Sequence, residues 1–119
     1  MNFKFLLLIV TAAAAVFVFL SFKSGCGLDS RAAVKELIDN GALVVDVRTP
    51  EEYAAGHYEN SVNIPLGELE SKIDLFGSKD NNIVVYCRTG NRSEKAKIIL
   101  ERYGFKNVTN GGGLKDMQF

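Results

Sequence analysis

Histidine and cysteine are scarce in this chain of 119 residues, which contains one histidine and two cysteines. One histidine beside one candidate site cysteine is too few to form a metal-binding cluster. A disulfide framework is not expected either, because Cys26 lies in an apolar leader and Cys87 lies in the candidate site. His57 belongs to a different motif from Cys87, so a nucleophilic Cys87 would have no histidine base.

Net charge is also missing, since 14 basic and 14 acidic side chains give a formal charge of zero. The basic residues form no cluster, and a nucleic-acid partner is therefore not expected. No internal repeat is present. The length and the 47% hydrophobic content predict one small domain preceded by an apolar segment.

The apolar leader runs without a charge from Phe5 to Phe22, after the positive Lys4. As a helix it would reach about 27 Å, close to the hydrocarbon core of a bilayer at about 30 Å. We expect residues 1–27 to be a signal or membrane-anchor segment with a linker, and residues 28–119 to be an exported, periplasmic or otherwise extracytoplasmic domain, membrane-tethered by the leader. Retention, cleavage, and lipidation at Cys26 stay open, although Lys23 is unusual for a lipidation site.

The rest of the chain alternates strand and helix patterns. This alternation predicts an α/β domain, with a small, mostly parallel sheet covered by helices on both faces. Ligands of such sheets bind beyond the carboxyl ends of the strands. The expected strands are 43–47, 61–64, 83–86 and 107–109; the expected helices begin at Asp29 or Ser30, at the capping box of residues 49–52, at Leu66 and at Arg92, and the glycines at 111–113 are expected to form a tight turn.

The strand 83–86 leads directly into a cysteine loop, residues 87–93, that contains a glycine and is followed by a helix. This order directs backbone N–H groups and a helix N-terminus at the Cys87 sulfur, which favours its thiolate. We expect the amides of residues 88–92 to form an anion cradle. Arg92 or Arg88 is expected to bind the anionic end of a substrate, because a guanidinium fork suits oxyanions.

The cysteine loop resembles the active loop of rhodanese (thiosulfate sulfurtransferase) domains. Two further segments resemble the signatures at the two ends of that family's domain. The resemblance extends from about Ala42 to Asp116 and, together with the leader, is closest to small exported rhodaneses of the phage-shock type. The matching segments are Cys87-Arg88-Thr89-Gly90-Asn91-Arg92, Asp46-Val47-Arg48-Thr49-Pro50-Glu51-Glu52-Tyr53 with Gly56-His57 and Asn63-Ile64-Pro65, and Gly112-Gly113-Leu114-Lys115-Asp116.

The resemblance implies a rhodanese-like fold and a sulfurtransferase. In this reaction the Cys87 thiolate takes the outer sulfur of thiosulfate, releases sulfite, and passes the sulfur from a persulfide to cyanide or a thiol. No metal or organic cofactor is implied, and a redox protein is a candidate partner. The implied substrate-binding residues are Arg88, Thr89, Gly90, Asn91 and Arg92, supported by Asp46, Arg48 and Ser93.

Other interpretations stay open. A non-catalytic binding or persulfide-carrier module is the main alternative function. A cysteine-dependent phosphatase is less favoured, because four residues separate Cys87 from Arg92, whereas those enzymes use Cys-x5-Arg. Asp46 and Arg48 either line the pocket or form a structural ion pair with Glu51 or Glu52. His57 is expected to be a turn residue bonded to the backbone.

Overall fold

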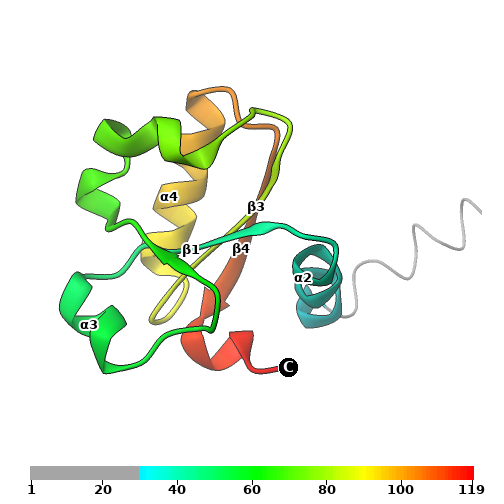
Figure 1. Cartoon of the computed structure of the whole chain (residues 1–119), viewed down its shortest axis with the longest axis vertical. Coiled ribbons are helices and arrows are strands. Elements are labelled where there is room, and N and C mark those ends of the chain that lie inside the picture. Colours follow the sequence, from blue (N-terminus) through cyan, green and yellow to red (C-terminus); the bar gives the residue numbers. More distant parts are fainter. Residues whose placement is uncertain (1–29) are drawn as a thin grey trace, which may run out of the picture. The chain divides into compact units, whose positions relative to one another are not determined.

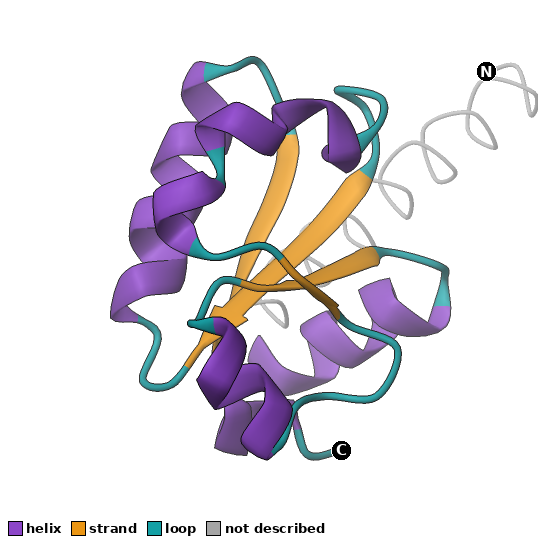
Figure 2. Ribbon diagram, turned by 60° about the vertical axis from the view of Figure 1, so that its left-hand side comes forward, coloured by secondary structure: helices purple, strands orange, loops and turns teal. Residues whose placement is uncertain are grey.

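The computed structural model describes residues 30–119, so the leader, the linker and Asp29 lie outside the described residues. Four parallel strands form one sheet in the order β2-β1-β3-β4, and helices lie on both of its faces (Figures 1 and 2). The strands are β1 (Leu43–Asp46), β2 (Val62–Asn63), β3 (Asn82–Cys87) and β4 (Asn107–Gly113); the helices are α2 (Ser30–Asp39), α3 (Pro50–Ala55) and α4 (Asn91–Arg102), with short 3₁₀ helices η1 (Leu66–Glu68), η2 (Glu70–Phe76) and η3 (Leu114–Met117).

The two central strands are buried on both faces, as their β-branched runs predict. Successive side chains alternate between two hydrophobic clusters. Val45, Ile83 and Val85 pack with Leu100 of α4 on one face of the sheet. Val84 packs on the other face with residues of α2 and η3. This packing fixes the end of β3 and therefore the position of Cys87.

The predicted parallel α/β sheet is confirmed, and so is the capping box that begins α3. In that box the Thr49 side chain accepts the Glu52 N–H, and Glu52 accepts the Thr49 N–H. No helix within residues 30–119 is both long and apolar enough to cross a bilayer.

The amphipathic helix expected from Leu66 is wrong in type. This segment forms η1 and η2, two 3₁₀ helices with a non-helical residue at Lys72 (φ −116°, ψ 24°). Leu69 and Phe76 are fully buried and pack into the cluster under α4. Tertiary packing of these two anchors therefore decides the path, and it overrides the helical periodicity.

Candidate active site

Cys87 is the last residue of β3, and its side chain is 1% exposed. The following loop turns back at Gly90, whose φ of 97° is a conformation that glycine adopts without the cost of a Cβ. As a result, the Gly90 N–H donates to the Cys87 sulfur over 3.0 Å. The Ser93 hydroxyl lies 3.4 Å from the same sulfur. Figure 1 shows this loop (yellow, between β3 and α4) at the carboxyl end of the sheet.

The loop stabilises the thiolate of Cys87. Burial is the largest single effect and raises the pKa of the thiol, but the hydrogen bonds together outweigh it. These come from the Ser93 hydroxyl and from the N–H groups of Ser93, Thr89 and Gly90, and the pKa of Cys87 is lowered overall. Of the cradle expected from the amides of residues 88–92, the N–H groups of Thr89 and Gly90 act on the sulfur, and Ser93, outside that range, adds its hydroxyl and its N–H.

Asn110 of β4 is part of this site and was missed by the sequence reasoning. Its side-chain oxygen accepts the Ser93 hydroxyl (2.7 Å) and the Gly112 N–H (2.9 Å). Its NH₂ group donates to the Gly90 carbonyl (3.1 Å) and to Glu94 (3.0 Å). All four hydrogen-bonding positions of the amide are thus used. An asparagine in a strand, where this residue type is depleted, was the available signal.

The expected tight turn at the three glycines is wrong, because residues 111–113 continue β4. The pairing with β3 has a register shift between Val85 and Cys87. The glycines allow the cysteine loop to approach the strand closely. A Cβ on Gly113 would overlap the backbone carbonyl oxygen of Arg88, and a Cβ on Gly90 would lie 3.4 Å from the Gly112 Cα. Glycine is needed at these positions because the backbones of the cysteine loop and of β4 approach each other closely.

The Arg92 guanidinium forms a bidentate ion pair with the Glu52 carboxylate of α3. Its two terminal nitrogens lie 2.7 Å and 2.9 Å from the two carboxylate oxygens. Arg92 holds the pKa of Glu52 down at about 2. The Cys87 thiolate in turn contributes to a raised pKa of Arg92, after the larger effect of Glu52. Arg92 therefore lies within electrostatic reach of the sulfur, but it is already held by a carboxylate.

Three other residues of the loop are exposed to solvent. Arg88, Thr89 and Asn91 are exposed, and within residues 30–119 their side chains make no hydrogen bond or ion pair. Thr89 acts on the sulfur through its backbone N–H. Among the described residues of this loop, Arg88 is thus the cation that is free to bind an anion.

Asp46 and Arg48 form a buried ion pair with each other, with 2.6 Å between the Arg48 terminal nitrogen and the Asp46 carboxylate. The expected ion pair with Glu51 or Glu52 is wrong in its partner. Arg48 pairs with Asp46, and Glu52 pairs with Arg92. Arg48 also donates to the Gly56 carbonyl at the end of α3 (2.7 Å). The pair thereby links the end of β1 to the carboxyl end of α3.

His57 is exposed, as expected for a turn residue. Its Nδ1 lies 2.9 Å from the Tyr53 carbonyl, and its ring stacks on that of Tyr53 with 3.7 Å between centroids.

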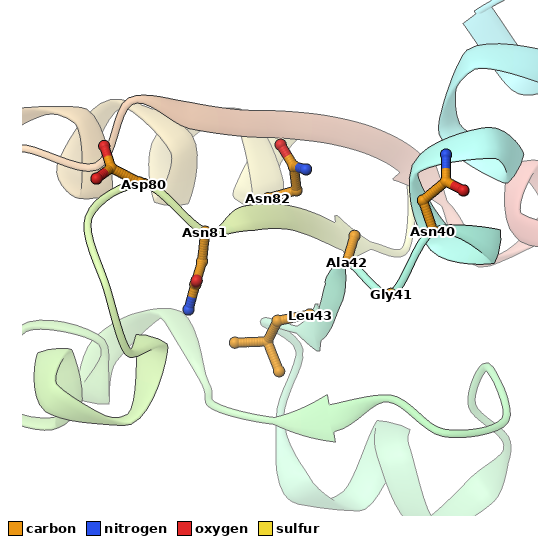
Figure 3. A pocket seen from close by; sticks show the side chains of 7 residues that line it. All are labelled: Asn40, Gly41, Ala42, Leu43, Asp80, Asn81 and Asn82. Carbon is orange, nitrogen blue, oxygen red and sulfur yellow. The ribbon is translucent and has the colours of Figure 1, made fainter.

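A pocket of about 320 Å³ lies at the opposite end of the sheet from Cys87 (Figure 3). Residues that precede or begin β1 and β3 line it, including Ala42 and Asn82. None of its lining residues belongs to the cysteine loop, so it is separate from this site.

Comparison with known proteins agrees with this geometry. The Rhodanese-like domain profile matches residues 30–117. Thiosulfate sulfurtransferase PspE of Escherichia coli (strain K12) is 42% identical over 74 residues, which cover 61% of this chain and 71% of PspE. The tRNA uridine(34) hydroxylase of Photorhabdus laumondii is 38% identical over 81 residues, or 63% of this chain and 23% of that protein. A solved rhodanese with anions from E. coli has a TM-score of 0.63 and 39% identity, over 66% of this chain and 94% of that one. The chain belongs to the rhodanese-like domain family.

Proposed function

We propose that this protein is a sulfurtransferase that moves a sulfane sulfur from thiosulfate, or a similar donor, to cyanide or a thiol through a persulfide on Cys87. The observation that carries this proposal is the buried Cys87 sulfur, with the Gly90 N–H at 3.0 Å and a lowered pKa. Hydrogen bonds that stabilise a thiolate also stabilise a persulfide anion. The similarity to a thiosulfate sulfurtransferase supports the same reaction.

The reaction has two balanced steps. The Cys87 thiolate attacks the outer sulfur of thiosulfate, a new S–S bond forms, and sulfite leaves with the electron pair of the broken S–S bond. Cyanide or a thiolate then attacks the outer sulfur of the persulfide and releases the Cys87 thiolate. Neither step needs an oxidant or a reductant.

Two loop arginines are candidates for binding the sulfonate end of the donor. Arg88 is exposed, and its guanidinium is uncommitted within residues 30–119. Arg92 uses two N–H groups on Glu52, and a guanidinium has five in all. We therefore assign the donor anion to Arg88 together with the free edge of Arg92. Thr89, Gly90 and Asn91 shape the same loop.

The test is the intact mass of the reduced full chain before and after treatment with thiosulfate. We expect a gain of about 32 Da, one sulfur atom, that cyanide removes and that Cys87→Ser abolishes. Cys26→Ser is the matched control and should still gain the sulfur. No gain on folded wild-type protein would reject thiosulfate as donor and favour a non-catalytic or persulfide-carrier module.

We also propose that the uncharged stretch from Phe5 to Phe22 directs the domain out of the cytoplasm and tethers it to the membrane. This proposal rests on the sequence alone. Intact spheroplasts that express the full chain provide the test. External protease should remove residues 30–119, and alkaline carbonate should leave the chain in the membrane fraction. A protected domain would contradict export, and extraction by carbonate would contradict the tether.

A further inference from the structure

In the ion pair between Glu52 and Arg92, further hydrogen bonds hold the Glu52 carboxylate in place. The Glu52 carboxylate also accepts the Thr49 hydroxyl (3.2 Å) and closes the Thr49 capping box at the start of α3. Its side chain is only 28% exposed. Glu52 is therefore fixed by α3, and it holds the guanidinium of Arg92, which lies in the first turn of α4 directly after the cysteine loop.

This pair changes the charge that the loop presents to a donor. The pKa of Glu52 is lowered to about 2, mainly by Arg92, so the carboxylate is ionised at any neutral pH and the pair carries no net charge. Arg48 is likewise neutralised by Asp46. On α4, Glu94 lies beside the site through its contact with Asn110. Within residues 30–119, Arg88 is the one uncompensated cation of the loop.

The donors of a sulfurtransferase differ in charge. Thiosulfate is a dianion, whereas an organic thiosulfonate carries the same transferable sulfur with a single negative charge. The Cys87 thiolate attacks either donor at the outer sulfur, and either sulfite or a sulfinate leaves with the electron pair. A fixed negative charge beside Arg92 penalises the dianion more than the monoanion, because Coulomb energy scales with the charge.

From these contacts we propose that Glu52 is a specificity-determining residue: it neutralises Arg92 and thereby restrains the preference of the site for dianionic over monoanionic sulfane-sulfur donors. This inference rests on the proposed function. Glu52 acts here through Arg92, and contact between its carboxylate and the donor is not required.

The experiment uses the full chain with Glu52→Gln, which removes the charge and keeps an oxygen to accept in the capping box. Glu51→Gln is the matched control, because Glu51 is exposed, adjacent, and loses the same charge. The measurement is kcat/KM for thiosulfate and for methanethiosulfonate, each with cyanide as acceptor at low salt. We expect the thiosulfate-to-thiosulfonate ratio to rise about three- to tenfold in Glu52→Gln and to stay within about twofold in Glu51→Gln.

A merely structural role of Glu52 would lower both rates together and leave the ratio unchanged, and that result would overturn the inference. An equal rise in Glu51→Gln would also overturn it, because the effect would then be one of general charge. If neither donor forms a persulfide on Cys87 in the wild type, the proposed function itself fails and the inference fails with it. Persulfide formation with an unchanged ratio leaves the proposed function standing and rejects the role of Glu52 alone.

Discussion

The Asn110 side-chain oxygen accepts the Ser93 hydroxyl over 2.7 Å and so ties strand β4 to the first turn of α4. The Ser93 Oγ also lies 3.4 Å from the Cys87 sulfur, so the single hydroxyl proton of Ser93 is shared between the sulfur and the Asn110 oxygen. The NH₂ group of Asn110 donates to the Gly90 carbonyl. The N–H of the same Gly90 donates to the Cys87 sulfur. One side chain therefore positions two groups of the thiolate cradle.

Asn110→Ala should lower the free energy of unfolding by about 1–3 kcal/mol, because it leaves several partly buried groups without a partner. The measurement is equilibrium unfolding in denaturant. Asn107→Ala is the control on the same strand, since Asn107 makes one exposed hydrogen bond to the Asp80 carbonyl. Equal losses in the two variants would contradict a special role of Asn110.

Ser93→Ala should raise the pKa of Cys87, because the Ser93 hydroxyl makes the largest of the contributions that lower it. The rate of iodoacetamide alkylation against pH reports this pKa, measured in a Cys26→Ser background so that one thiol reacts. We expect the midpoint to move to higher pH and the rate near neutrality to fall. Ser71→Ala, which loses an exposed bond to the Glu68 carbonyl, should leave the midpoint in place.

The same shift predicts how stability depends on pH. The pKa of Cys87 is lower in the folded chain than in the unfolded chain, so thiolate formation adds stability that is fully present above the unfolded pKa. This contribution is lost as the pH falls through the folded pKa. In Ser93→Ala the increase in the free energy of unfolding between neutral and alkaline pH should be smaller than in the wild type. Unfolding curves measured across that pH range test this. An unchanged gain would argue against the hydroxyl as its source.

The parts of the site that are local in sequence were predictable, and those that depend on distant contacts were not. The run from Ile83 to Tyr86 and the glycine of the loop placed Cys87 correctly at the end of a buried strand. In contrast, Arg92 meets Glu52 across 40 residues, and Asn110 meets Ser93 across 17. No local pattern encodes such pairs, because packing of α3 and β4 against the loop creates them. The predictions for the leader lie outside the described residues and stay predictions.

Glu52→Gln should flatten the acid dependence of stability. The pKa of Glu52 is about 2 in the folded chain and near 4.5 without its partners. The ionised carboxylate thus contributes stability above pH 4.5 that is lost as the pH falls towards 2. Thermal unfolding of wild type and variant over this range is the measurement. Glu51→Gln should keep the wild-type slope, and a variant at Glu52 that also keeps it would contradict the ion pair.

Gly113→Ala should displace the cysteine loop. A Cβ at this position would overlap the Arg88 carbonyl oxygen and approach its carbon to 3.0 Å, and both atoms are backbone that cannot rotate away. We expect a loss of several kcal/mol, about 2–4, in the free energy of unfolding and a slower alkylation of Cys87, because the loop amides leave the sulfur. Gly67→Ala is the control: a Cβ there meets nothing within 4 Å. Near-normal stability and alkylation in Gly113→Ala would show that the loop does not depend on its close approach to β4.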